Sequence, residues 1–154
     1  METKTIGKFT ITIKDGFTRK ELPFYHEWIA ALRSGKYPQG KDFLVSTYGE
    51  GEKQYCCLGV LSKIQDRLPD IGYRSDGYRG LSPSNPSYAA LRACGSIPNC
   101  AYVTDSKNMV YRHLAYLNDK GATFNEIADI IEYLWQPVNE SLPNKENPPT
   151  LCEV

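Results

Sequence analysis

The segment Cys-Cys-Leu-Gly-Val-Leu, from Cys56 to Leu61, constrains the fold of this chain more than any other stretch. Apolar side chains continue beyond it at helical spacing, so we predict an amphipathic helix over residues 56–67. Cys56 is placed at the edge of the apolar arc and Gly59 on the polar side. Such a helix must pack against other elements in one core. Its apolar arc comprises Cys57, Val60, Leu61, Ile64 and Leu68.

Alternating residues predict short strands near the N-terminus and just before this helix. Phe9, Ile11 and Ile13 alternate with threonines, which is the period of a half-buried strand. Strand-forming residues at 43–48 and 53–55 flank a Gly-Glu-Gly-Glu turn, which predicts a β-hairpin that leads into the helix. Strands and helices are therefore both expected in the core.

Helical spacing of apolar residues predicts further helices over residues 23–34, 109–117 and 124–135. The first is followed by Gly35, where a left-handed residue commonly ends a helix. The last is preceded by a capping box that begins at Thr123, which satisfies backbone groups at a helix start. This last helix therefore has the clearest boundaries.

The length of 154 residues suits one domain with one hydrophobic core. Residues 1–137 are predicted to form this domain, and residues 138–154 a proline-rich C-terminal tail. Residues 69–108 are rich in Gly, Pro, Ser and Asn, with one short helix near 86–93, and so much irregular chain is typical of a binding loop. The predicted fold class is α+β: a mainly helical single domain with a short N-terminal strand or hairpin and a long irregular central segment.

The charge balance excludes several classes of function. Lys plus Arg total 18 and Asp plus Glu total 18, so no global field attracts nucleic acid or an anionic membrane, and any anion site must be local. No stretch approaches the roughly twenty apolar residues of a membrane helix. Residues 1–16 lack a signal-peptide pattern, and five cysteines are an odd number, so reduced thiols are expected. A Cys94 to Cys100 bridge is the alternative.

Three blocks of sequence carry a resemblance to a known family. They are Trp28 to Tyr37 with Gln39 and Gly40, Tyr55 to Leu61, and Leu117 to Asp119 with Phe124 to Asp129. In content, order and spacing they resemble a family of small uncharacterised proteins of tailed bacteriophages. The resemblance implies a phage origin and action in the cytoplasm of the infected bacterium, and it transfers no catalytic residue. The family pattern has a further cysteine where this chain has Ser62, which weakens a three-thiol metal site on the helix.

The adjacent cysteines are candidates for nucleophilic chemistry because they stand at the predicted start of their helix, where the helix dipole stabilises a thiolate. Cys56 with His113 or His26 as base is the catalytic candidate, whereas Cys57 is placed in the apolar arc. Packing is the alternative reading, since free cysteines are among the most commonly buried residues. Neither this pair nor Cys94 to Cys100 with His113 has a usual zinc spacing, so no metal and no cofactor is predicted.

Two segments have the composition of an anion-binding or nucleotide-binding loop. The turn with Lys36 and Lys41 has the glycine and lysine spacing of a phosphate-binding P-loop. However, a predicted helix precedes it, and Asp42 stands where a P-loop has the hydroxyl residue that binds Mg²⁺. Between residues 72 and 80, tyrosines that can stack on a base accompany arginines that can bind phosphate. The alternative is a helix C-cap and turn for the first segment and a solvated surface loop for the second. The candidate ligand-binding residues are Lys36, Tyr37, Gln39, Lys41, Tyr73, Arg74, Tyr78, Arg79, His113, Asn118 and Asp119.

These observations lead to one preferred function. The last predicted helix carries Glu126, Asp129 and Glu132 and no lysine or arginine, so duplex DNA is not expected as a partner. We expect a non-catalytic phage accessory protein, acting against host defence, that binds and sequesters a small anionic, nucleotide-derived host molecule; a homodimer would suit a shared pocket. The alternatives are a cysteine- or histidine-dependent hydrolase or transferase, and a protein inhibitor that contacts a host enzyme through exposed tyrosines.

Overall fold

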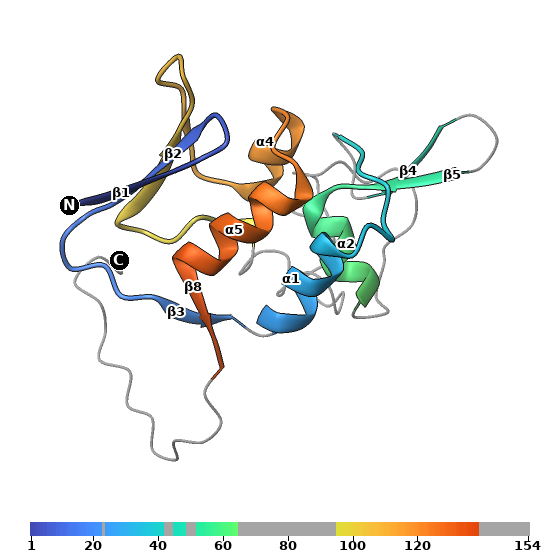
Figure 1. The fold of residues 1–154 in the computed structure, drawn as a ribbon, viewed down its shortest axis with the longest axis horizontal. Coiled ribbons are helices and arrows are strands. Elements are labelled where there is room, and N and C mark those ends of the chain that lie inside the picture. Colours follow the sequence, from blue (N-terminus) through green and yellow to red (C-terminus); the bar gives the residue numbers. More distant parts are fainter. Residues whose placement is uncertain (23, 42–44, 49–51, 65–94, 139–154) are drawn as a thin grey trace, which may run out of the picture.

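The computed structural model of the protein describes residues 1–22, 24–41, 45–48, 52–64 and 95–138. A four-stranded antiparallel sheet lies on one side of the molecule, and helix α5 crosses between this sheet and helices α1 and α2 (Figure 1). The helices of the described residues are α1 (Tyr25–Arg33), α2 (Cys57–Ile64), α4 (Leu114–Asp119) and α5 (Phe124–Leu134). The predicted α+β class is confirmed.

The four-stranded sheet has the order β1-β2-β6-β7. The alternating strand predicted at Phe9 is confirmed as β2, and its aromatic and isoleucine side chains are buried. The turn between β1 and β2 has two residues, and Gly7 occupies its first position at φ 59°, where this kind of hairpin takes glycine. The strands are β1 (Glu2–Ile6), β2 (Phe9–Ile13), β6 (Ala101–Thr104) and β7 (Val110–Tyr111).

Two smaller sheets complete the described strands. The predicted hairpin is confirmed as an antiparallel pair of β4 (Val45–Tyr48) and β5 (Glu52–Tyr55). A parallel pair, β3 (Lys20–Leu22) and β8 (Trp135–Pro137), joins the chain before α1 to the chain after α5. Helix and strand therefore occupy comparable shares of the described residues, and the expectation of a mainly helical domain is wrong.

The helices α1 and α5 begin and end close to their predicted positions because their signals are local. Gly35 follows α1 at φ 75°, as a left-handed residue after a helix should. The capping box of Thr123 and Glu126 is present at the start of α5. The two helices pack side by side, and Arg33 of α1 forms ion pairs with Asp129 at 2.8 Å and with Glu132. Two of the three acidic residues of α5 are thus paired within the protein.

Helix α2 is more deeply buried than its amphipathic pattern predicts. Every residue from Cys57 to Ser62 is buried, including Gly59 and Ser62 on the side expected to be polar. Trp28 of α1 is fully buried and donates its Nε1 hydrogen to the Cys57 carbonyl at 2.9 Å, which joins α1 to the first turn of α2. The prediction of a polar face is therefore wrong as far as Ser62, and only Lys63 is exposed within this helix.

The prediction of a helix over residues 109–117 is wrong for the first half of that range. Val110 and Tyr111 pair with β6 as strand β7, and α4 begins only at Leu114. Within the segment 69–108, expected to be irregular, residues 101–104 form β6. The predicted short helix at 86–93 and the tail from residue 139 lie outside the described residues. No helix in the described part of the chain is long and apolar enough to cross a membrane.

Candidate functional site

The amide side chains of Gln39 and Asn118 form a polar node with Gly40, Ala122 and Phe124. The Gln39 Nε2 group donates to Asn118 Oδ1 at 2.9 Å and to the Ala122 carbonyl at 2.7 Å. Gln39 Oε1 accepts from the Phe124 amide at 3.2 Å. Asn118 is fully buried, and its Nδ2 group donates to the Gly40 carbonyl at 2.8 Å. Both side-chain amides are therefore used inside the protein.

The polar node also holds the strand that precedes α2. The Gly40 amide donates to the Tyr55 carbonyl at 2.8 Å, and the Tyr55 amide donates to the Pro38 carbonyl at 2.8 Å. A Cβ atom on Gly40 would lie 2.8 Å from the Cβ of Gln54, so only glycine fits this approach. The three sequence blocks that carry the phage-family resemblance thus meet at one node. We assign Asn118 to the support of the fold, because its full burial leaves it no contact with a ligand. Gln39 is exposed, but its side-chain amide is engaged by Asn118, Ala122 and Phe124.

The adjacent cysteines are structural in this fold. Cys56 and Cys57 lie outside any disulfide and have no exposed surface, so Cys56 is not accessible as the nucleophile that its predicted place at the edge of the apolar arc suggested. Burial raises the pKa of the Cys57 thiol well above its ordinary value, and the neighbouring Cys56 and Asp119 raise it further. Cys100 is disulfide-bonded, which corrects the expectation of reduced thiols at that position.

The remaining candidates from the sequence do not gather into one described site. Lys36 and Lys41 are exposed after α1, and the Tyr37 ring packs edge-on against Tyr55 at a centroid distance of 5.5 Å. His113 precedes α4. Its ring meets Tyr116 edge-on at 5.3 Å, and Asp119, at the other end of that helix, is half-buried. Tyr73, Arg74, Tyr78 and Arg79 lie outside the described residues. No three His, Cys, Asp or Glu side chains cluster as metal ligands within the described ranges.

A pocket that sequence reasoning missed lies where three turns meet. We call it the lysine pocket; its volume is about 280 Å³, and three ammonium groups from separate parts of the chain line it. One comes from the β1–β2 turn, one from the β6–β7 turn and one from the end of α4. The lining residues are Lys8, Asp105, Ser106, Lys107, Met109, Tyr111 and Lys120.

The β1–β2 turn places Lys8 in the lysine pocket by docking on the connection between α4 and α5. Lys8 Nζ donates to the Lys120 carbonyl at 2.6 Å, where the carbonyl groups at a helix end attract a cation. Gly7 lies directly against the Glu126 carboxylate, and a Cβ atom there would overlap it. Gly121, at φ 102°, leaves room for the Lys8 ammonium group, which would lie 3.1 Å from a Cβ atom at that position.

The opposite wall of the lysine pocket is a turn organised by Asp105. Its Oδ1 atom accepts from the backbone amides of Lys107 at 2.9 Å and Met109 at 3.0 Å. Its Oδ2 atom accepts from the Tyr111 hydroxyl at 2.8 Å. The Tyr111 hydrogen bond, aided by the two backbone amides, lowers the pKa of the Asp105 carboxyl. The carboxylate therefore stays ionised at neutral pH and holds the turn in one conformation.

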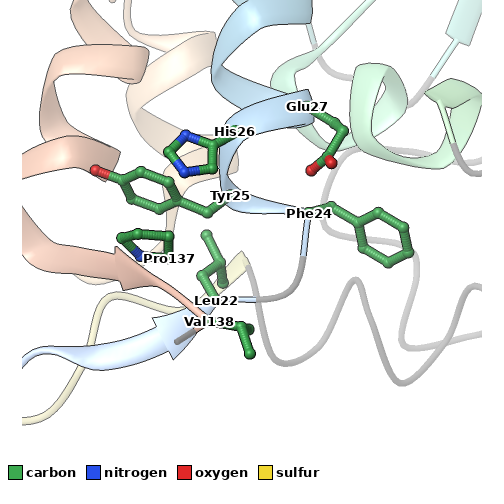
Figure 2. A pocket seen from close by; sticks show the side chains of 7 residues that line it. All are labelled: Leu22, Phe24, Tyr25, His26, Glu27, Pro137 and Val138. Carbon is green, nitrogen blue, oxygen red and sulfur yellow. The ribbon is translucent and has the colours of Figure 1, made fainter. Parts of the chain in front are cut away.

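A second pocket, of about 370 Å³, lies at the start of α1 (Figure 2). Tyr25 and His26 point to one side of it, with ring centroids 5.1 Å apart, and Phe24 points to the other. Phe24 is 46% exposed and has a left-handed φ of 62°. The described residues that line this pocket include Glu27 but no lysine or arginine. It suits an apolar occupant rather than an anion.

The lysine pocket has the chemistry of an anion site. Three lysines and one aspartate line it, so the pocket carries a local excess of positive charge in a chain whose formal net charge is zero. Each ammonium group offers three donors to phosphate or carboxylate oxygens. Each of the three lysines stands in or beside a turn, but no local motif indicates that these turns meet.

The fold and the lysine pocket define a small α+β domain with a local cationic site. Residues 23–134 match the family model described as Domain of unknown function (DUF8296). This match covers more than half of the chain, and the protein belongs to that family. Neither the curated proteins nor the solved structures gave a match. Lys107 and Lys120 lie within the matched residues, and Lys8 precedes them.

Proposed function

We propose that the protein is a tailed-bacteriophage accessory protein that binds and sequesters a small anionic, nucleotide-derived molecule in the cytoplasm of its bacterial host. The observation that carries this proposal is the lysine pocket, with Lys8, Lys107 and Lys120 around one cavity. The balanced overall charge makes a non-specific polyanion surface a poor explanation for this cluster. The resemblance to phage proteins supports the biological setting, and sequestration of a defence signal is a role that anion binding alone can perform.

The position of the cysteines favours binding over the alternative of cysteine-dependent hydrolysis. A nucleophilic thiol must reach its substrate and must ionise. Cys56 and Cys57 have no exposed surface, and burial raises the pKa of Cys57. Binding at the lysine pocket needs neither access to these thiols nor their ionisation.

The strength of binding should depend on each pocket lysine. A hydrogen bond to a charged group contributes about 1.5–3 kcal/mol, and about 1.4 kcal/mol corresponds to a tenfold change in affinity. Loss of one ammonium group is therefore expected to weaken anion binding about tenfold or more. Because the pocket is open to solvent on a protein surface, affinity should also fall as salt concentration rises.

Isothermal titration calorimetry with pyrophosphate and a panel of nucleotides would test the proposal. We expect binding by the wild-type protein and about tenfold or greater weakening in Lys107→Gln and in Lys120→Gln. The matched controls are Lys36→Gln and Lys41→Gln, which remove the same charge from the exposed turn after α1 and should leave affinity unchanged. Absence of binding across the panel, or loss of binding only in the two control variants, would contradict an anion site at the lysine pocket.

A further inference from the structure

We infer that the lysine pocket selects nucleotides whose base carries an exocyclic amino group, with the phosphates on the lysines and the amino group donating to Asp105. The inference rests on the proposed function and concerns the class of ligand. It follows from two further side chains that line the pocket beside the lysines, namely Asp105 and Met109.

Asp105 adds a negative charge to a pocket that is also lined by three positively charged lysines. A carboxylate within a phosphate site would repel the ligand, so its presence favours a ligand with an anionic end and a hydrogen-bond-donating end. Oδ1 accepts from two backbone amides. Among the described residues Oδ2 accepts one hydrogen bond, from Tyr111, and an ionised carboxylate oxygen can accept a second. The pocket thus combines ammonium donors for phosphate with one fixed acceptor for an amino group.

Met109 supplies the surface on which a base can lie. Its side chain lines the lysine pocket and is 57% exposed. A thioether is polarisable and makes favourable contacts with aromatic rings. Asp105 accepts from the Met109 amide, so the Met109 backbone and the carboxylate belong to the same turn. The inference places a base over Met109 with its edge toward this acceptor.

The test compares ligands that differ at the predicted contact and in the proton on the neighbouring ring nitrogen. Cytidine diphosphate and uridine diphosphate have the same phosphates and ring, but cytosine has an amino group where uracil has a carbonyl; adenosine and inosine diphosphates form the equivalent purine pair. Calorimetry should show the amino-bearing member of each pair binding about tenfold more tightly, since its partner turns an oxygen toward the carboxylate. Pyrophosphate alone should bind more weakly than the amino-bearing nucleotides.

Two variants test the residues of the lysine pocket. Asp105→Asn retains an oxygen for the backbone amides of Lys107 and Met109 but replaces the other oxygen with a donor, so it should remove the preference for amino bases without weakening pyrophosphate binding. Met109→Ser should weaken nucleotides and leave pyrophosphate unchanged. Equal affinity within both ligand pairs for the wild-type protein, with pyrophosphate still bound, would overturn this inference and leave the anion site standing. Failure of every anion to bind, pyrophosphate included, would overturn both proposals.

Discussion

Replacement of Asn118 by alanine should destabilise the protein more than any single change on its surface. Asn118 is fully buried, accepts from Gln39 Nε2 at 2.9 Å and donates to the Gly40 carbonyl at 2.8 Å. Asn118→Ala removes both bonds. Gln39 keeps its bond to the Ala122 carbonyl, but the buried Gly40 carbonyl loses the amide that donates to it.

The expected loss follows from these contacts. Each lost hydrogen bond contributes about 0.5–1.5 kcal/mol, and a buried acceptor left without a donor costs about 1–3 kcal/mol. Allowing for their overlap, the free energy of unfolding should fall by about 2–4 kcal/mol. For a domain of this size, that corresponds to a decrease in melting temperature of roughly 5–12 °C.

Urea denaturation followed by circular dichroism would measure the effect of Asn118→Ala. The matched control is Asn125→Ala, an exposed asparagine in the first turn of α5, which should change stability by less than about 0.5 kcal/mol. A double-mutant cycle with Gln39→Ala should show a coupling of about 0.5–3 kcal/mol, as for residues in direct contact. An effect of Asn118→Ala as small as that of the control would refute the structural role of the polar node.

Three further outcomes are expected. Ser62→Ala should stabilise the protein by about 1 kcal/mol in thermal denaturation, because the buried Ser62 hydroxyl makes no hydrogen bond in the described structure; a loss of stability would contradict this. Gly7→Ala should cost about 1–2 kcal/mol of backbone strain and also displace Glu126. Its loss of stability should therefore exceed that of Gly35→Ala, where the added methyl group meets open space, and equal losses would argue against the docked turn. Iodoacetamide followed by peptide mass spectrometry should modify Cys56 and Cys57 only after unfolding, and native labelling at pH 8 would show that they are accessible.

Elements with complete local signals could be predicted from the sequence. Helix α5 has a capping box and a continuous apolar stripe, and both are interactions between residues a few positions apart. The Gly7-Lys8 turn is also a local signal, because a two-residue loop that begins with glycine is typical of a hairpin. That signal could have indicated β1, although the strand itself is mostly exposed and lacks an apolar alternation.

Elements that depend on distant partners could not be predicted in the same way. Val110 and Tyr111 form a strand because β6 lies beside them, while their apolar spacing alone also fits a helix. The burial of Ser62 depends on what packs over α2, which helical periodicity does not contain. Strand pairing and tertiary packing override local preference at both positions.

The candidate site shows the same division. The cysteine pair and the Lys36–Lys41 turn could be named as candidate sites from the sequence because their residues lie close together in the chain. Lys8 is separated from Lys107 and Lys120 by most of the chain and meets them because the β1–β2 turn docks beside the end of α4. A pocket assembled from three turns has no sequence motif, and the structure is needed to find it.

The most direct test of the lysine pocket is a titration of ¹⁵N-labelled protein with cytidine diphosphate, followed by amide chemical shifts. We predict that the largest changes occur at Lys8, Lys107, Met109 and Gly121, which surround the lysine pocket or flank its lysines. Changes confined to residues 36–41, or no saturable change at millimolar ligand, would contradict the assignment of anion binding to this pocket.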